Sequence, residues 1–233
     1  MKKLITVLAL CLAGGALVFA QDADDKPEPK APVSEDIRAL QLAADLADYG
    51  YKNESASALI EAAEILSQVQ VQPLGVEATT SGQPAQGGKA ANSSGYTPEK
   101  LLADGKNMAK GDKTLTKRAD DVKKSLKRGT RGAVGGPKYS SDFCYGNKGT
   151  TSYTCPFYAG QLAEVAVHSI DGCDLDLYVY DESNNLIEKD SSYSYDGYVS
   201  FWPRWTGNFV IVVKNCSRYD GCFELYTNYG NVI

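Results

Sequence analysis

Histidine is almost absent from this chain of 233 residues, and its scarcity excludes several kinds of active site. The one histidine, His168, cannot supply both histidines of the His-Glu-x-x-His motif of zinc proteases. No glycine-flanked serine elbow accompanies it, as a serine hydrolase would need. His168 lies in a Val-Ala-Val-His-Ser run that predicts a strand end, so we interpret it as an ordinary edge or surface residue. The sequence therefore indicates that the protein is not an enzyme.

Long apolar runs are missing after the first twenty residues, so no later segment predicts a membrane-spanning helix. Residues 1–20 have the pattern of a secretory signal peptide. Lys2 and Lys3 precede a short apolar run, and small residues lead to a cleavage position after Ala20. We therefore expect a secreted or periplasmic protein with no transmembrane segment once the signal is removed.

Closely paired cysteines with the C-x₂-C spacing of a structural zinc site are also absent. Beyond Cys11 in the signal, the cysteines lie in the last part of the chain: Cys144, Cys155, Cys173, Cys216 and Cys222. Cysteines confined to one region of an exported chain predict disulfides there. The shortest loops favour Cys144–Cys155 and Cys216–Cys222. Cys173 is an alternative partner for Cys216, because the strands beside them would end together, and one thiol is left over.

Composition divides the chain into segments and predicts an α+β fold of several domains. A C-terminal antiparallel β-sandwich of jelly-roll type follows N-terminal helical segments. The expected segments are a signal at 1–20, a disordered stretch at 21–33, a helical hairpin at 34–67, a disordered linker at 68–96, a basic helical segment at 97–127, a glycine-rich linker at 128–138 and the sandwich at 139–233.

Start signals locate the helical hairpin. Ser34 is a good N-cap, and Ser55 opens the second helix. Apolar residues then recur at helical spacing, and Gly50 is expected to end the first helix. The short turn predicts an antiparallel pair. Its apolar faces would either form a homo-oligomer or grip a partner, or else pack on the chain itself.

The basic segment suggests an anionic partner at first sight. Residues 97–138 carry 12 Lys and Arg against 5 Asp and Glu, although the formal net charge of the chain is −5. Such a block can bind nucleic acid or an anionic surface. In an exported protein we favour a solvated helix lying against its acidic neighbours, and we expect no nucleic-acid partner.

Short alternating runs with turn residues between them predict the sandwich. The expected strands are 151–158, 162–169, 174–180, 185–190, 197–202, 207–215 and 222–228. The predicted core consists of Val165, Val167, Leu175, Leu177, Val179, Val199, Phe201, Phe209, Ile211, Val213, Phe223 and Leu225.

The strand near 174–180 also suggests a metal site. Side chains alternate across a strand, so its leucines and Val179 share the core face while Asp174 and Asp176 share the other. A hard cation with oxygen ligands would relieve the repulsion between two carboxylates, and Asp171 and Asp181 near the strand ends could add ligands. Calcium is therefore the expected cofactor. The alternative is that these aspartates are solvated or bond to neighbouring loops.

Aromatic residues in polar surroundings are the candidate ligand-binding residues. They are Tyr193, Tyr195, Tyr198, Trp202 and Trp205. Exposed rings offer a large rigid area with a polar tip, which suits stacking on sugars or packing on an extended polypeptide. The alternative is that several of these rings complete the rim of the core.

Four stretches resemble the bacterial pre-peptidase C-terminal domain. They are Phe157–Gln161, Asp174–Asp181, Val199–Phe201 and Gly207–Val213, within about residues 139–229. That family is a β-sandwich similar to the collagen-binding domains of clostridial collagenases. The resemblance implies a non-catalytic accessory domain that binds substrate or assists secretion and often carries calcium. This chain departs from the pattern, since no hydrolase precedes the domain and its cysteines are more numerous.

Two functional readings follow. In the favoured one the protein is a bacterial exported binding module that recognises an extracellular or envelope polymer, either polypeptide or polysaccharide. In the other it is a structural or assembly protein that oligomerises through its helical segments.

Overall fold

The computed structural model describes residues 33–85, 95–129 and 136–230, with side chains described only to residue 126 in the middle range. The predicted signal peptide and nearly all of the predicted disordered stretch at 21–33 lie outside these ranges. The described helices are α1 (Glu35–Lys52), α2 (Ala56–Gln68), α3 (Pro98–Met108) and α4 (Lys113–Gly129). None of them combines the length and the hydrophobicity needed to cross a bilayer.

The helices begin where the sequence predicts. The Ser34 hydroxyl accepts a hydrogen bond from the Ile37 N–H, and the Ser55 hydroxyl accepts one from the Ala58 N–H. These caps satisfy backbone donors that a helix start leaves unpaired. The expected end at Gly50 is wrong, because α1 continues to Lys52.

Gly50 instead allows α1 and α2 to pack closely. A Cβ atom at this position would lie 2.4 Å from Leu59 Cδ2 and 3.2 Å from the Leu59 backbone nitrogen. The glycine is therefore required by the contact between the helices rather than by a turn.

The apolar faces of the helices pack within the chain. Residues of α1 and α2 form one core cluster with residues of α3 and α4, and this cluster also contains Ala166 and Tyr226 of the β-sheet. By its internal contacts Ala31–Ile233 is one compact unit. Of the readings left open for the hairpin, the structure shows the one in which it packs on its own chain.

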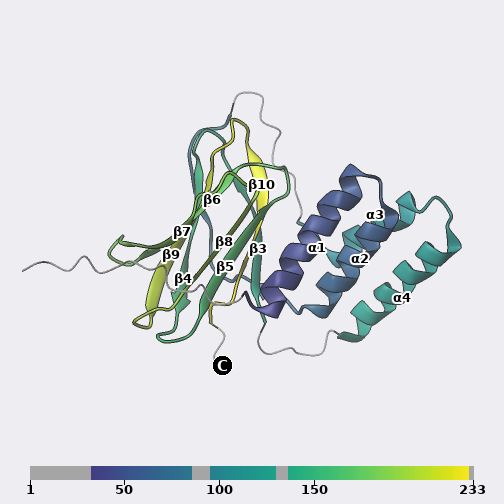
Figure 1. Ribbon diagram of the computed structural model, residues 1–233, viewed down its shortest axis with the longest axis horizontal. Coiled ribbons are helices and arrows are strands. Elements are labelled where there is room, and N and C mark those ends of the chain that lie inside the picture. Colours follow the sequence, from purple (N-terminus) through teal and green to yellow (C-terminus); the bar gives the residue numbers. More distant parts are fainter. Residues whose placement is uncertain (1–32, 86–94, 130–135, 231–233) are drawn as a thin grey trace, which may run out of the picture. The chain divides into compact units, whose positions relative to one another are not determined.

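The strands form two five-stranded sheets, one facing the other (Figure 1). The first sheet has the order β1-β3-β10-β5-β8 and the second the order β2-β4-β9-β6-β7. Their bounds are β1 Gln72–Pro73, β2 Thr79–Ser81, β3 Lys138–Cys144, β4 Thr150–Phe157, β5 Ala163–Ser169, β6 Leu175–Asp181, β7 Leu186–Asp190, β8 Asp196–Phe201, β9 Gly207–Asn215 and β10 Gly221–Thr227. Each of the seven expected strands corresponds to one of β4 to β10, within about one residue at each end.

Two regions differ from expectation. The stretch at 68–96, expected to be a disordered linker, supplies an edge strand to each sheet, with β1 parallel to β3 and β2 antiparallel to β4. It also places Leu74, 3% exposed, in the sandwich core. Strands of two and three residues are held by backbone pairing and are too short to show a period. β3 was also not expected as a strand.

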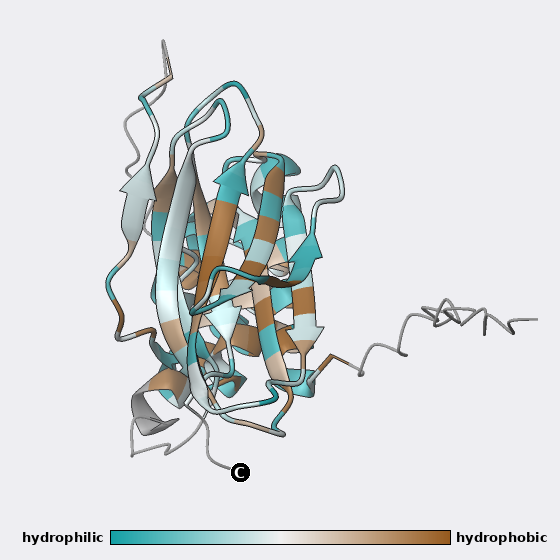
Figure 2. Ribbon diagram, turned by 90° about the vertical axis from the view of Figure 1, so that its left-hand side faces the viewer, coloured by the Kyte–Doolittle hydropathy of each residue, from teal (hydrophilic) through white to brown (hydrophobic). Residues whose placement is uncertain are grey.

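The sandwich core is confirmed residue by residue. All twelve predicted core residues belong to one buried cluster between the sheets. Hydrophobic and polar residues alternate along several strands in Figure 2, as a sheet with one face on a core requires. On β6 the core face is confirmed as Leu175, Leu177 and Val179.

We predict that Leu177→Ala lowers the free energy of unfolding by about 2–5 kcal/mol, because it leaves a cavity where the side chain is fully buried. Leu186→Ala is the matched control, since Leu186 lies on the neighbouring edge strand β7 and is 49% exposed. It should change stability by no more than about 0.5 kcal/mol. Chemical denaturation of the two variants measures both values, and equal losses would contradict the assignment of the core face.

Candidate functional site

The predicted aromatic residues lie at the two opposite ends of the sandwich. Tyr193 and Tyr195 precede strand β8, whereas Trp202 and Trp205 follow it. With a rise of about 3.3 Å per residue, the length of β8 separates the two pairs by roughly 17 Å. The structure therefore does not bring the five predicted residues together on one surface.

Tyr193 and Tyr195 border a surface hollow of about 580 Å³, which we call the tyrosine hollow. Tyr193 is 95% exposed and Tyr195 is 48% exposed. A third ring, Tyr219, is 47% exposed and lines the same hollow. The remaining lining residues are Gly172, Asp174, Ser194, Cys216, Ser217 and Arg218. Tyr219 is not among the predicted residues, because its turn lies beside Tyr193 and Tyr195 only in the folded chain.

Hydrogen bonds hold the loops of the tyrosine hollow in place. The Asp174 carboxylate accepts from the Ser194 N–H at 3.2 Å, and the Ser217 hydroxyl accepts from the Asp174 N–H at 2.8 Å. The Tyr219 hydroxyl donates to the carbonyl of Gly172 at 3.1 Å. Three separate loops are thus tied together before any ligand arrives, which lowers the entropy cost of binding.

The remaining predicted aromatic residues have structural contacts. Trp205 stacks on the core residue Phe209, with ring centroids 5.7 Å apart. Tyr198 donates its hydroxyl hydrogen bond to the buried carboxylate of Glu164 at 2.8 Å. Trp202 is different, because it is 57% exposed, against 38% for Trp205.

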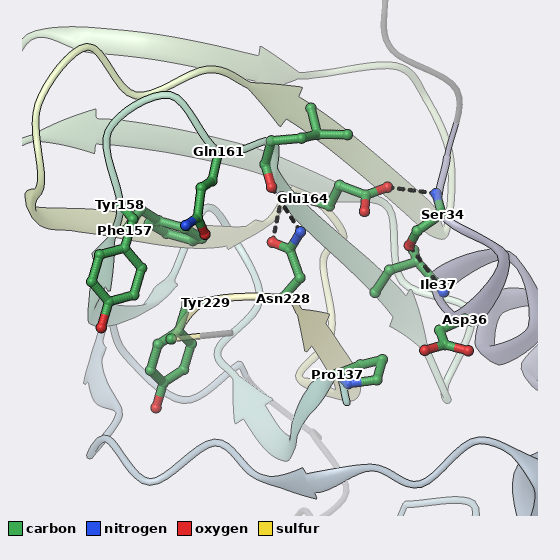
Figure 3. Close-up of a pocket in the computed structure, with 12 residues that line it drawn as sticks. Ser34, Asp36, Ile37, Pro137, Phe157, Tyr158, Gln161, Glu164, Asn228 and Tyr229 are labelled. Atoms are coloured by element: carbon green, nitrogen blue, oxygen red, sulfur yellow. Dashed lines mark hydrogen bonds between the residues drawn. The ribbon is translucent and has the colours of Figure 1, made fainter. Parts of the chain in front are cut away.

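A second, smaller pocket of about 170 Å³ lies where the start of α1 meets this end of the sandwich (Figure 3). Figure 3 shows the Glu164 carboxylate reaching the Ser34 N–H, a distance of 2.8 Å. Asn228 bonds to the backbone of Glu164 and of Leu162 in the same view. Glu164 is only 1% exposed, and its carboxylate joins the start of α1 to the sheet by accepting hydrogen bonds from the Ser34 N–H and the Tyr198 hydroxyl. We therefore interpret this pocket as part of the helix–sheet contact.

The aspartates predicted to bind calcium each have a separate partner. Asp174 accepts from Ser194 as described, and Asp171 accepts from the backbone N–H of Cys222 at 2.8 Å. Asp181 accepts hydrogen bonds from two loop residues, Ser183 and Asn185. These contacts agree with the alternative interpretation, in which the carboxylates form hydrogen bonds with neighbouring loops. Calcium binding stays a prediction.

Asp176, like Asp181, is buried, and it is 8% exposed. It accepts hydrogen bonds from the Tyr178 hydroxyl at 2.8 Å and from Lys214 Nζ at 3.1 Å. The Cys216 thiol also donates to it at 3.2 Å. Burial acts to raise the pKa of Asp176, but these hydrogen bonds outweigh burial and lower the pKa overall.

The predicted disulfides are not found among the described cysteines. Cys144 and Cys155 are free thiols. The Cys144 thiol donates to the carbonyl of Gly149, whereas Cys155 pairs with Phe209 near the other end of the sheet. The structure does not show the pairing by shortest loop. Cys144 ends β3 and its thiol also lies near the carbonyl of Val213, which is four residues along β9 from Phe209, the residue opposite Cys155.

Cys173 and Cys216 do lie at one end of the sandwich, as predicted, but on different sides of it. Cys216 faces Asp176 on the outer surface of its sheet. Cys173 is 1% exposed, and its sulfur accepts from the Asn215 side chain. Cys222, the other expected partner of Cys216, is buried in β10 of the opposite sheet. Burial raises the pKa of Cys144 to about 11 and that of Cys155 to about 12, so these thiols are poor nucleophiles.

The burial of His168 differs most from expectation. It is completely buried, whereas we expected an edge or surface residue. Its Nδ1 lies 2.6 Å from Asp196 Oδ1 of β8, and its Nε2 lies 3.3 Å from Asp48 Oδ2 of α1. Burial alone would lower the pKa of His168, but these carboxylates outweigh burial and raise the pKa to about 10. A histidine held in this way does not act as a general base near neutral pH.

A buried carboxylate lies close to His168. Glu224 of β10 is fully buried, and burial raises its pKa. It accepts hydrogen bonds from the Tyr96 N–H, the Tyr139 hydroxyl and the Tyr226 hydroxyl. Such bonds compensate for the loss of water around a buried charge. The described residues therefore show a network that joins helices and sheet, and no activated nucleophile.

Comparisons with known proteins add little to this geometry. No family model matches the chain, and a search of curated proteins finds no match. Among solved structures, the chain is similar to the pre-peptidase C-terminal domain of collagenase from Bacillus anthracis, with 18% identity over 40% of this chain and 89% of that one, at a TM-score of 0.33.

Two further structures are similar at the same level. The Yersinia pseudotuberculosis-derived mitogen has 13% identity over 43% of this chain and 91% of that one, at a TM-score of 0.35. Aeromonas hydrophila PliG, a periplasmic inhibitor of g-type lysozyme, has 15% identity over 43% of this chain and 90% of that one, at a TM-score of 0.31. At such values the likeness carries no argument about function, and the resemblance to the pre-peptidase C-terminal domain remains a resemblance.

We predict that Cys216 is the first of these thiols to react with an alkylating reagent in the native protein, because it is partly exposed while Cys144, Cys155 and Cys173 are buried. Unfolding in denaturant without reductant should then make the buried thiols reactive. Peptide mass spectrometry reads both stages. Peptides joined by a disulfide in the unreduced sample would contradict the structure.

We also predict that Asp176→Asn lowers the free energy of unfolding by about 1–3 kcal/mol at neutral pH, because the charged hydrogen bonds to Lys214 and Tyr178 are lost. A carboxyl with a lowered pKa stabilises the fold above its unfolded-state pKa, and this contribution disappears as the pH falls through its folded-state pKa. The difference between variant and wild type should therefore shrink towards pH 2.

Glu182→Gln is the control for this series, since Glu182 is exposed in the neighbouring loop. Its stability should follow that of the wild type at each pH. A loss in Asp176→Asn that persists unchanged at pH 2 would show that the carboxylate charge is not responsible.

Proposed function

We propose that this protein is a non-catalytic, exported binding module, and that its sandwich binds an extracellular or envelope polymer, polysaccharide or extended polypeptide, at the tyrosine hollow. The observation that supports this most is the exposure of Tyr193. A ring that is 95% exposed contributes almost nothing to the core, and two further half-exposed rings stand around the same hollow. Contiguous exposed rings on tied loops are typical of a binding surface.

The composition of the hollow suits a polymer rather than a small apolar ligand. Its lining combines three tyrosines with the charged side chains of Asp174 and Arg218 and with serine hydroxyls. Rings with hydroxyl tips stack on flat apolar faces and form hydrogen bonds at their edges. Charged groups of both signs would orient polar groups of that chain.

The helical segments play a supporting part in this proposal. Their apolar stripes are consumed in contacts with each other and with the outer face of the first sheet. The alternative function is oligomerisation through these helices. It would need a surface other than the apolar stripes, which are already buried within the chain. Its test is the mass of the chain in solution by light scattering.

The test of the binding proposal is Tyr193→Ala, assayed by pull-down on insoluble polysaccharides, fibrillar collagen and cell-envelope material. We predict a loss of affinity of roughly tenfold or more for the polymer that the wild type binds, because a central aromatic contact is removed. The melting temperature should not change, since Tyr193 has little contact with the fold.

Two alanine variants serve as controls. Trp202→Ala removes an exposed ring at the opposite end, and Tyr49→Ala removes a tyrosine that is 57% exposed on α1. Both should bind as the wild type does. Tyr195→Ala is less suitable, because the Tyr195 ring lies 6.0 Å from the His168 ring and its loss would also affect the fold. Full binding by Tyr193→Ala, with a loss in Trp202→Ala, would place the site at the other end.

A further inference from the structure

Three side chains from three different elements converge where α1 meets the first sheet. They are Asp45 of α1, His168 of β5 and Asp196 of β8. One ligand atom from each lies within 4.8 Å of the ligand atoms of the other two. Asp48, one helical turn after Asp45, approaches the same imidazole.

This cluster is short of positive charge. Three carboxylates surround one imidazole, so two negative charges remain even when His168 is protonated. Among the described residues, no lysine or arginine forms an ion pair with Asp45, Asp48 or Asp196. Asp45 has the most to gain from a cation, because it accepts no hydrogen bond from a described residue and lies close to the carboxylate of Asp196. A divalent cation carries the charge that is missing.

The histidine provides a second, independent observation. Its side chain is completely buried, yet within the described part of the chain its Nε2 has no hydrogen bond of acceptable geometry. Nε2 lies near the Asp48 carboxylate, which is itself held by the hydroxyl of Tyr96. A histidine that binds a metal through one ring nitrogen usually donates the other N–H to a carboxylate. Asp48 is placed for that role.

We propose that Asp45, His168 Nδ1 and Asp196 bind one divalent metal ion, while Asp48 orients the imidazole through Nε2–H. Binding replaces the hydrogen bond between His168 and Asp196, and the imidazolium proton leaves to solvent. The 2.6 Å between Nδ1 and Asp196 Oδ1 must lengthen, because an ion of this class lies about 2.0–2.2 Å from each ligand atom. The partly exposed carboxylates of Asp45 and Asp196 can move for this.

The donor set favours zinc over calcium. Imidazole nitrogen with two carboxylates suits zinc and similar transition-metal ions, whereas calcium prefers six or more oxygen ligands. The bound ion would cross-link α1, β5 and β8, because each of these elements supplies one ligand. It would thereby fix the helical layer on the sheet. This site is distinct from the calcium site expected near Asp174 and Asp176.

The experiment is calorimetric titration of the full-length, untagged and chelator-treated chain with zinc chloride, repeated in two buffers of different ionisation enthalpy. We expect one ion per chain, release of about one proton on binding and a melting temperature raised by several degrees. Calcium chloride at the same concentration should not reproduce the heat of zinc binding, the proton release or the rise in melting temperature.

The variants separate metal binding from fold stability. Asp45→Asn should weaken zinc binding at least tenfold, and without metal it should melt no lower than the wild type, since it removes a carboxylate repelled by Asp196. Asp36→Asn, an exposed aspartate in the first turn of the same helix, should bind zinc normally. Cys216→Ser should also bind normally, which excludes the partly exposed thiol as the ligand.

Three results would overturn the proposal. They are the absence of zinc binding, equal affinity in the wild type and Asp45→Asn, and loss of binding in Cys216→Ser. The cluster would then be a hydrogen-bonded ionic bridge in which His168 retains its proton. None of these results bears on the tyrosine hollow, whose test uses a different surface and a different ligand.

Discussion

The structure depends on the fact that its first sheet is covered on both faces. Strands β5 and β10 are buried along their whole length, with the sandwich core on one side and the helices on the other. Polar side chains on the helix-facing side therefore cannot reach bulk water. Burying an unpaired polar or charged group costs several kcal/mol, so each must find a partner in the other layer. Glu164, His168 and Glu224 are among these side chains, and their partners on the helical side include Ser34, Asp48 and Tyr96.

The same network shapes the surface where we place binding. Asp196, which bonds to His168, directly follows Tyr195 in the loop that borders the tyrosine hollow. The Ser169 N–H donates to the carbonyl of Tyr195 at 2.8 Å, and the rings of His168 and Tyr195 meet edge to face. The position of this loop is thus fixed from beneath by buried contacts. Such support lets exposed rings keep one arrangement at little entropic cost when a ligand binds.

The sequence predicts local features well and tertiary ones poorly. Alternation with period two is a property of neighbouring residues, so the core faces of the strands could be read directly, and the caps Ser34 and Ser55 could be read in the same way. The position of His168 could not, because its partners come from α1 and β8. The only signal was weak, since Ala166 is the one apolar residue on the helix-facing side of β5, between Glu164 and His168. The structure does not show the disulfide pairings for a related reason: loop length carries no information about which strands meet. Cys144 lies on β3 beside β10, whereas Cys155 lies on β4 beside β9.

The tyrosines divide into two classes, and the division supports the binding proposal. One class is buried or half-buried between the helices and the sheet. In this class Tyr96 donates a hydrogen bond to Asp48, and Tyr139 and Tyr226 each donate one to Glu224. These three tyrosines serve to satisfy carboxylates at the helix–sheet contact. Tyr193 has no such task, and its ring is almost wholly in water. An exposed aromatic ring contributes little to folding and adds apolar surface that favours association. Tyr193 stands beside two half-exposed rings, Tyr195 and Tyr219, around one hollow on loops tied to a rigid sheet, and this grouping supports the proposed contact with another molecule.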